Sequence, residues 1–336
     1  MVLSHRTARM CFRAPQRPDS RGAIPAVSAC LKPSVPDVEM LDRARACLIA
    51  RGVPKEELAQ VDVLVPSADL RRRIDGAVPH VWPYPIPAHG LWRLEQGIYV
   101  VHPALCAQQA AVEMNRMELV EYLIEMCARY DLPIRAGDEY VERHAPLAVQ
   151  DLALHVAASA GQRGIRRLRR ALPFVCDGAR SPMETALYLM LRLPRCMGGA
   201  HLVGLELAHR MEVTGMARDL TGRAFVECDA FLATDGIDFE YNGIVHEDEE
   251  VFASDEERRR ALEAMGYSVL TVTRHALFDA QRYRRLLTAV LHRVGLNVDR
   301  LPDDYWERAE ALRRFAVRGC VPRSGSDICV AADWAC

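Results

Sequence analysis

Apolar residues recur at two different spacings along this chain, and the two spacings predict a mixture of helices and strands. Helical spacing is found in the segments 38–51, 107–130, 147–160, 162–172, 181–193, 255–265, 276–294 and 303–318. Strand-like spacing, bounded by glycine, proline or acidic residues, is found in 61–66, 91–94, 97–103, 226–232, 237–242 and 267–273. This order predicts an α/β protein, with a smaller α+β module preceding a mixed sheet that is flanked by helices.

The same patterns suggest where the chain divides. Residues 1–36 combine arginines and prolines without sustained periodicity, so we expect a disordered leader; a transit peptide, or a true start at Met40, is the alternative. Residues 37–145 are expected to form the amino-terminal α+β module, which has a regulatory role in this interpretation. Residues 146–300 are expected to form the main α/β domain, and residues 301–336 a carboxy-terminal helix with a loose tail.

The composition of the chain limits the classes of protein to which it can belong. The chain has 336 residues, 50% of them hydrophobic, and a formal net charge of −2, so any nucleic-acid surface must be local. No apolar run approaches the roughly 20 residues that cross a bilayer, and the amino terminus lacks an apolar signal core. The 11 cysteines are scattered and never spaced as C-x-x-C, which favours reduced thiols. We therefore expect a cytoplasmic protein without a membrane partner.

The most informative stretch is a hairpin between residues 226 and 242. A two-residue loop at Asp235 and Gly236 is typical of a type I′ turn and would place Asp229 opposite Asn242. A turn one residue earlier would instead place Asp229 opposite Glu240. Strict alternation puts Glu227 and Asp238 on the same face in both registers, so one face of the hairpin is predicted to be acidic.

Carboxylates held together on a sheet face repel one another unless a cation neutralises them. Oxygen ligands favour Mg²⁺ or Mn²⁺, which typically binds one or two protein carboxylates together with phosphate oxygens. Such a site suits phosphodiester hydrolysis, because the metal polarises the phosphoryl group and activates water. The alternative is an acidic face that is exposed to solvent and binds no ligand.

Two further groups of residues have both a functional and a structural interpretation. Ser181, followed by Pro182 and Glu184, forms a capping-box pattern, so helix capping alone accounts for Glu184. The segment 162–172 places arginines on one helical side, where guanidinium groups can bind phosphates or simply be solvated. These candidate DNA contacts are Arg163, Arg166, Arg167, Arg169 and Arg170. Because Lys32 and Lys55 are the only lysines, no lysine is available later in the chain.

Four motifs occur in one order: RALPFVCDGARSPMET, VECDAF, FEYNGIVH and SDEERRRALEAMGYSVLTVT. With them, residues 163–292 resemble the Vsr-like (very short patch repair) branch of the PD-(D/E)XK nuclease superfamily, in the form attached to AbiEi-type antitoxin-related proteins. The resemblance implies a restriction-endonuclease-like mixed sheet flanked by helices. It also implies a metal site of Glu184, Asp229 and Glu240, with His246 as the proton-transferring residue in place of the usual lysine.

The resemblance leads to two functional hypotheses. The first is a Mg²⁺- or Mn²⁺-dependent endonuclease that hydrolyses DNA, with Glu184, Asp229, Glu240 and His246 as its catalytic residues. The second is a catalytically inactive nuclease fold that binds DNA or acts as an antitoxin-like regulator. It is favoured by Asn242, which stands where the related pattern has an acid. The segment VWPYPIPAHGLWRLEQGIYVVHPALCAQQAA resembles the regulatory portion of the same proteins and implies a toxin or another regulatory protein as partner.

Overall fold

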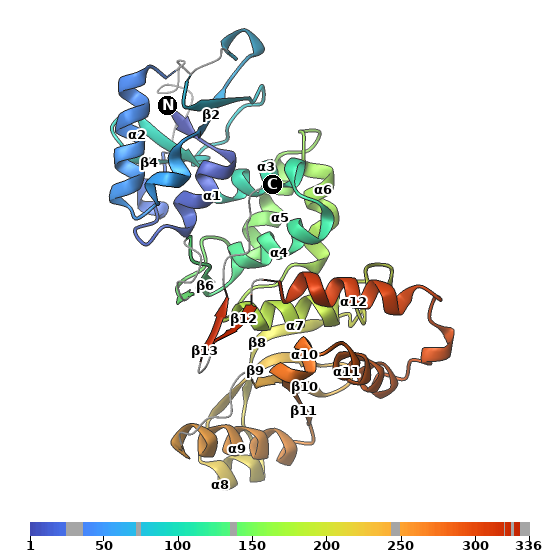
Figure 1. Cartoon of the computed structure of the whole chain (residues 1–336). Coiled ribbons are helices and arrows are strands. Elements are labelled where there is room, and N and C mark those ends of the chain that lie inside the picture. The colour runs from blue at the N-terminus through green and yellow to red at the C-terminus, as the bar shows by residue number, and fades with distance from the viewer. Residues whose placement is uncertain are drawn as a thin grey trace. The chain divides into compact units, whose positions relative to one another are not determined.

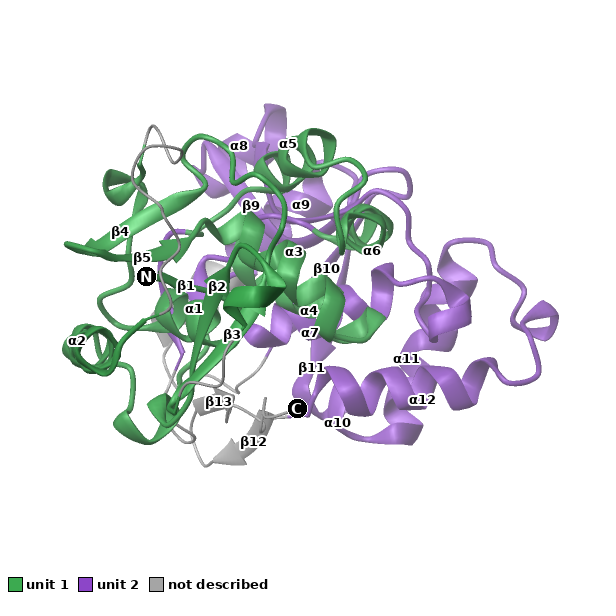
Figure 2. Cartoon of the chain, turned by 90° about the horizontal axis from the view of Figure 1, so that it is seen from above, with its two compact units in different colours: residues 1–127, 131–136, 145–175 green, residues 128–130, 137–144, 176–336 purple. Residues whose placement is uncertain are grey.

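Two sets of short strands, one near the amino terminus and one after residue 204, build two separate sheets in the computed structural model of the chain. The structure describes residues 1–24, 36–71, 75–134, 140–242, 249–318, 320–323 and 326–329. The chain divides into two units, which are coloured separately in Figure 2. Unit 1 comprises residues 1–127, 131–136 and 145–175, and unit 2 comprises residues 128–130, 137–144 and 176–336.

Unit 1 contains a mixed five-stranded sheet in the order β3-β2-β1-β5-β4. Strand β1 pairs antiparallel with β2 and parallel with β5, while β2 and β3 are parallel and β4 and β5 are antiparallel. The strands are β1 (Val2–Leu3), β2 (Val61–Val65), β3 (Ala77–Val81), β4 (Leu91–Glu95) and β5 (Ile98–Val101). All five residues of β2 are buried, as expected for an inner strand that is covered on both faces.

The amino terminus is an integral part of this sheet, so the predicted disordered leader is wrong for residues 1–24. Strand β1 lies between β2 and β5, and Leu3 is completely buried. Helix α1 (His5–Arg13) follows and buries Met10, Cys11 and Phe12. The sequence pattern that would predict these elements is weak. A two-residue strand has no measurable period, and the few apolar residues that α1 buries lie among arginines. Residues 25–35, the rest of the predicted leader, lie outside the described residues.

Helices complete unit 1. They are α1, α2 (Val38–Ala50), α3 (Pro103–Glu113), α4 (Arg116–Cys127), α5 (Val149–Ala158) and α6 (Ile165–Ala171), with 3-10 turns η1 (Ser20–Gly22), η2 (Lys55–Leu58), η3 (Ala68–Leu70) and η4 (Leu172–Phe174). The single helix predicted over 107–130 is two helices. Asn115 separates them, since its Oδ1 accepts hydrogen bonds from the backbone amides of Met117 and Glu118 and caps α4.

Unit 2 contains a mixed four-stranded sheet in the order β11-β10-β9-β8. Strands β8 to β10 are antiparallel neighbours, and β11 is parallel to β10. The strands are β8 (Leu205–Glu212), β9 (Phe225–Leu232), β10 (Ile237–Asn242) and β11 (Ser268–Thr273). The prediction that the hairpin and the later strand share one sheet is confirmed.

Helices flank this sheet on both sides, as the α/β prediction required (Figure 1). Helix α7 packs against β8, β9 and β10 and is itself covered by α12, whereas α8 and α9 pack together and α9 contacts β9 and β11. The remaining elements of unit 2 are α7 (Pro182–Arg192), η5 (Arg195–Met197), α8 (Gly215–Thr221), α9 (Glu249–Ala264), α10 (Arg274–Phe278), α11 (Ala280–Arg293), η6 (Val298–Arg300) and α12 (Tyr305–Ala316).

Three predicted boundaries need correction. The main domain does not begin at residue 146, because residues 145–175, with α5 and α6, belong to unit 1. Helix α9 begins at Glu249, before the predicted cap at Ser254. The tail after α12 is not wholly irregular: β12 (Cys320–Arg323) pairs antiparallel with β13 (Ser326–Cys329). A further short pair consists of β6 (Tyr130–Asp131) and β7 (Val141–Glu142).

The described residues bear on two expectations from composition, the absence of a membrane span and the state of the cysteines. In that part of the chain, no helix combines the length and the apolar character that a membrane span requires. The cysteines for which the structure gives a state are all free, which agrees with the prediction of reduced thiols: Cys11, Cys47, Cys106, Cys127, Cys176, Cys196 and Cys228.

Candidate active site

The β9–β10 hairpin has the second of the two predicted registers. Ile237 pairs with Leu232 and Asp238 with Phe231, so residues 233–236 form a four-residue loop instead of the predicted two-residue turn. Gly236 adopts φ +62°, whereas Asp235 is not among the residues with positive φ, and a type I′ turn needs both. The observed register is the one that brings the two strand acids, Asp229 and Glu240, level with each other.

Strand β9 does not alternate strictly between its two faces. Val226 and Cys228 pack in one apolar cluster with Phe231, although a strict period of two would put Phe231 on the opposite face. The irregularity lies at Asp229. The ladder between β8 and β9 lacks the pair of Asp229 with Ala208, and Ala208 has φ +49°, an unusual backbone for a residue with a Cβ. Asp229 therefore has no registered partner on β8.

Asp229 is held between two elements. Its Oδ1 accepts a hydrogen bond from Nη2 of Arg180 at 2.9 Å, and its Oδ2 accepts one from the backbone amide of Tyr241 at 3.0 Å. The second bond joins β9 to β10 beyond their last registered pair, Ala230 with Phe239. The carboxylate therefore lies where the two strands separate.

Glu184, in the first turn of α7, lies near enough to this carboxylate to interact with it electrostatically. The predicted cap is present: the Glu184 amide donates to Ser181 Oγ at 3.1 Å, and the Ser181 hydroxyl donates to Glu184 Oε1 at 3.2 Å. Glu184 Oε2 accepts from the backbone amide of Arg180 at 2.9 Å, one residue before the position that a standard capping box uses. Burial and the nearby Asp229 carboxylate, in that order, raise the pKa of Glu184 to about 7.

Two arginines connect the predicted acids into one cluster. Arg180 contacts Asp229 and also forms ion pairs with Glu227 at 3.2 Å and Glu184 at 3.9 Å. Arg258 of α9 forms ion pairs with Glu240 at 3.0 Å and Asp229 at 3.9 Å. Asp229 is thus the common partner. Glu184, Asp229 and Glu240 thus belong to one network of ion pairs through guanidinium groups that the prediction had left out, and the metal site itself stays a prediction.

Asp238 was also left out of the predicted site, although the sequence analysis placed it on the acidic face of the hairpin. Its side chain has no exposed surface, and the Cys228 thiol is the weak hydrogen-bonding group beside a carboxylate that has no well-aligned partner in the described part of the chain. Burial, followed by the charges of Glu240 and Asp229, raises its pKa to about 8, while Arg258 and the nearby Cys228 thiol partly offset this. A repeated acid at strand spacing, as in Asp238 and Glu240, was the signal available in the sequence.

Three acids of the hairpin are buried, contrary to the solvent-exposed alternative, whereas Glu227 on the same predicted face is partly exposed. The exposed fractions are 7% for Asp229, 0% for Asp238 and 8% for Glu240. The donor set of buried carboxylates fits a hard divalent cation. The spacing is wider than a bound ion requires, because no three of these acids are found with their oxygens all within 4.8 Å of one another in the described chain. Binding would require the carboxylates to turn from the arginines toward a shared ion.

Two other predicted positions bear on this site. Asn242 is exposed at the end of β10 and lies opposite Thr273 of β11. His246, the predicted proton-transferring residue, lies outside the described residues, so its role stays a prediction.

The five arginines predicted to contact DNA belong to unit 1, on and just before α6, and not to the unit that carries the acids. All five are exposed. Arg167 has a structural role, since its guanidinium donates hydrogen bonds to the carbonyl oxygens of Val112 and Met114 at the end of α3. Arg163, Arg166, Arg169 and Arg170 remain candidate phosphate contacts.

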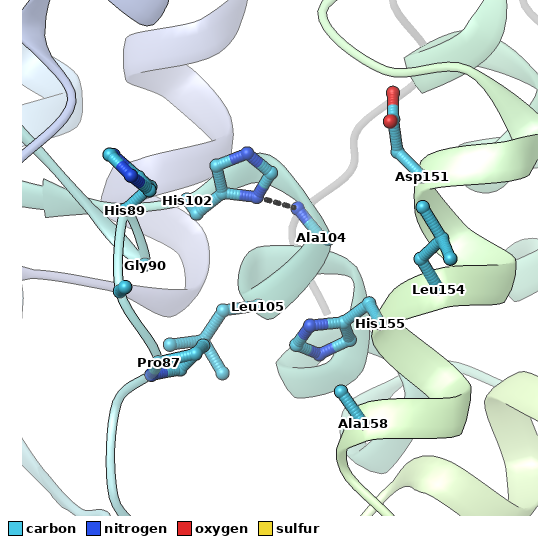
Figure 3. A pocket seen from close by; sticks show the side chains of 11 residues that line it. Pro87, His89, Gly90, His102, Ala104, Leu105, Asp151, Leu154, His155 and Ala158 are labelled. Atoms are coloured by element: carbon cyan, nitrogen blue, oxygen red, sulfur yellow. Dashed lines mark hydrogen bonds between the residues drawn. The ribbon is translucent and has the colours of Figure 1, made fainter. Parts of the chain in front are cut away.

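Unit 1 also contains an open pocket of about 250 Å³. Figure 3 shows His155 and Asp151 of α5 facing His102, whose Nδ1 accepts a hydrogen bond from the Ala104 amide at 3.1 Å. Burial lowers the pKa of His102 and lowers that of His155 to about 4, so His155 is neutral at pH 7. Asp151 is the only acid among the lining residues. The acid cluster of unit 2 is therefore the stronger candidate for metal-assisted chemistry.

In comparisons with known proteins, no family model matches the chain, and neither a curated protein nor a solved structure matches it.

Proposed function

We propose that unit 2 is a divalent-metal-dependent nuclease domain that hydrolyses phosphodiester bonds in DNA, in the manner of the PD-(D/E)XK superfamily. The order of its elements supports this assignment. Helix α7 is followed by three antiparallel strands, then by α9, and then by β11 parallel to β10. This is the kind of mixed sheet between helices that the motif resemblance implies, with the acids on α7, β9 and β10.

The observation that carries the proposal is a buried cluster in which the acids outnumber the arginines that pair with them. Glu184, Asp229, Asp238 and Glu240 are all buried. Two arginines, Arg180 and Arg258, form ion pairs within the cluster, and they leave two of the acids with raised pKa values. A divalent cation would remove this repulsion, and Mg²⁺ or Mn²⁺ is the ion that carboxylate oxygens select.

Asp229, Glu240 and Glu184 are the residues that would hold the ion. When bound, it would supply Lewis-acid activation of the phosphoryl group and of water. Tyr241 fixes the orientation of Asp229 through its backbone amide, and the Ser181 cap fixes Glu184. A bound cation would favour the ionised form of Glu184, whose pKa is raised to about 7 in its absence.

Arg180 and Arg258 have a second role in this proposal. Their guanidinium groups pair with Asp229 and Glu240 in the structure, and they would be available to phosphate oxygens if those carboxylates held a cation instead. Arginine suits this exchange, because its planar donor groups match carboxylate and phosphate geometry equally well.

Plasmid cleavage in Mg²⁺ or Mn²⁺ tests the proposal. The Asp229→Asn and Glu240→Gln variants should lose cleavage, because they remove charge at the cation while keeping side-chain size. Glu256→Gln is the matched control: Glu256 lies on α9 and pairs with Arg260. Equal cleavage by the wild type and Asp229→Asn, or no cleavage of any DNA form in either metal, would contradict the proposal.

The second candidate function is a catalytically inactive nuclease fold that binds DNA or a partner protein. Two observations favour it: ion pairs from Arg180 and Arg258 already partner Asp229 and Glu240, and Asn242 is an uncharged residue at the end of β10. Thermal unfolding with Mn²⁺ separates the two functions. A ligand that binds the native state raises the Tm, so an unchanged Tm at millimolar Mn²⁺ would favour the inactive scaffold.

A further inference from the structure

Two histidine rings stack on each other in unit 1, at the start of α1 and on β3. The ring centroids of His5 and His80 are 3.6 Å apart, and the ring planes differ by 13°. His5 is the first residue of α1 and has φ +47°, a left-handed backbone that side-chain-bearing residues rarely adopt. Strain of this kind persists only where the surrounding structure enforces it, and it is often found at functional sites.

A buried polar network fixes one nitrogen of each ring. His5 Nδ1 lies 3.0 Å from Ser4 Oγ, and His80 Nε2 lies 2.7 Å from Asp62 Oδ1. The other oxygen of Asp62 accepts hydrogen bonds from the Thr7 amide at 3.1 Å and the Thr7 hydroxyl at 3.0 Å. Ser4, Thr7 and Asp62 are all buried. A carboxylate bound to one ring nitrogen is the usual outer partner of a metal-binding histidine.

A third potential ligand approaches the pair from the end of α3. Glu113 Oε1 is 3.9 Å from His5 Nε2, while its Oε2 accepts a hydrogen bond from Arg9 at 2.7 Å. One nitrogen of each histidine and one oxygen of Glu113 lie within 4.8 Å of one another. Among the described residues, this is the group of histidine, cysteine and acidic side chains whose spacing could hold a metal ion.

We propose that His5, His80 and Glu113 bind a divalent transition-metal ion, for which Zn²⁺ is the best match. Two imidazoles and one carboxylate form a ligand set that zinc enzymes use, with a fourth position open to water or substrate. Imidazole nitrogen also disfavours Mg²⁺ and Ca²⁺, which prefer oxygen ligands. This site would be independent of the carboxylate cluster in unit 2 and of the function proposed for it.

Charged groups of both signs surround the site. Asp62 and Glu113 supply two carboxylates, and Arg9 and Arg163 lie close enough to influence His5. Burial is the main cause that lowers the pKa of His5 to about 3, followed by His80. His5 is therefore neutral at pH 7, which leaves a nitrogen lone pair free for a metal.

Binding requires one change in the arrangement of the rings. Stacked, nearly parallel rings cannot both contain the ion in their planes, so at least one ring must rotate out of the stack. In a tetrahedral zinc site the two nitrogens would be about 3.4 Å apart, given zinc–nitrogen distances of about 2.0–2.1 Å. The candidate ligand atoms now lie within 4.8 Å of one another, so the two nitrogens would have to approach by at most about 1.4 Å.

Zinc binding by the full chain tests the proposal, with two surface glutamates as a matched pair. Glu113 and Glu57 have similar exposure, 35% and 36%, and each pairs with an arginine of α1, namely Arg9 and Arg6. The metal-stripped wild type and Glu57→Gln should each bind Zn²⁺ at this site with the same affinity. Glu113→Gln should bind at least about tenfold more weakly, since loss of even an outer partner costs that much.

Two further measurements distinguish the loss of a ligand from damage to the fold. Unfolding in a chelator should give the same Tm for Glu113→Gln and Glu57→Gln, which shows that the fold is intact. Co²⁺ bound to the wild type should show the visible absorption of a tetrahedral site, and His80→Gln should lose it. Wild-type affinity in Glu113→Gln, or no uptake of Zn²⁺ by the wild type at micromolar concentration, would overturn the proposal.

Discussion

The substitution Asp238→Asn should change how the stability of unit 2 depends on pH. Asp238 has no exposed surface, and its pKa is raised from 3.8 to about 8, mainly by burial and then by Glu240 and Asp229. Between these two values the folded protein keeps a proton that the unfolded chain releases. The contribution of Asp238 to stability is therefore fully present below pH 3.8 and is lost as the pH rises through 8.

The size of the effect follows from the size of the pKa shift. One proton bound only in the folded state lowers the free energy of unfolding by about 1.4 kcal/mol for each pH unit. Over the whole interval the loss is on the order of 5 kcal/mol, which is a large fraction of the stability of an ordinary domain. Asparagine has nearly the same shape and does not titrate, so this part of the pH dependence should disappear in the variant.

Urea unfolding at closely spaced pH values from 5 to 8 measures the effect, with fluorescence and circular dichroism used together to separate the two units. Asp235→Asn is the matched control, because Asp235 is an exposed acid in the loop of the same hairpin. Glu184, whose pKa is about 7, titrates in both proteins and largely cancels in the difference.

Parallel stability curves for the variant and the wild type would contradict this prediction. If Asp238→Asn and the wild type lose stability with the same slope between pH 5 and 8, Asp238 holds no extra proton in the folded state. The charge repulsion on which the proposed cation site depends would then be absent at this position.

Three further predictions concern the local structure. Leu3→Ala should lower the free energy of unfolding of unit 1 by about 2–5 kcal/mol, because Leu3 is fully buried in β1. An unchanged Tm would instead agree with the predicted disordered leader. Ser181→Ala should cost about 1 kcal/mol in urea unfolding of unit 2, since it removes the cap of α7. Arg167→Ala should lower the free energy of unfolding by about 1 kcal/mol, because it leaves the carbonyl groups of Val112 and Met114 without this donor. The control Arg170→Ala should change it by less than about 0.5 kcal/mol. Equal losses for the two variants in a thermal melt would contradict the capping role.

Several features could be predicted from the sequence because they depend on residues that are close together in the chain. The Ser181 and Glu184 cap was predictable because both partners lie within one helical turn. The shared sheet of the hairpin and β11 followed from an apolar strand after a helix. The convergence of Glu184 with Asp229 and Glu240 came from the motif resemblance, since neither spacing nor period relates α7 to β9.

The register of the hairpin shows where local signals become insufficient. Asp235 and Gly236 favoured a two-residue turn, yet the structure has a four-residue loop. The carbonyl oxygen of Gly236 accepts a hydrogen bond from the Ser268 amide, at the start of β11, at 2.9 Å. The position of β11 thus contributes to a turn more than 30 residues away, and no local propensity contains that contact.

Spacing and capping act over a few residues, and they were enough to establish most elements, the α/β class and the acids of the hairpin. Long-range packing was needed to place β1 inside a sheet, to assign α5 and α6 to unit 1, and to bury the hairpin acids. It also brought Arg180 and Arg258 onto Asp229. These outcomes depend on contacts between residues that are far apart in the chain. The burial of such a residue, and the charges beside it, are set by its neighbours in space, which a local sequence pattern cannot identify.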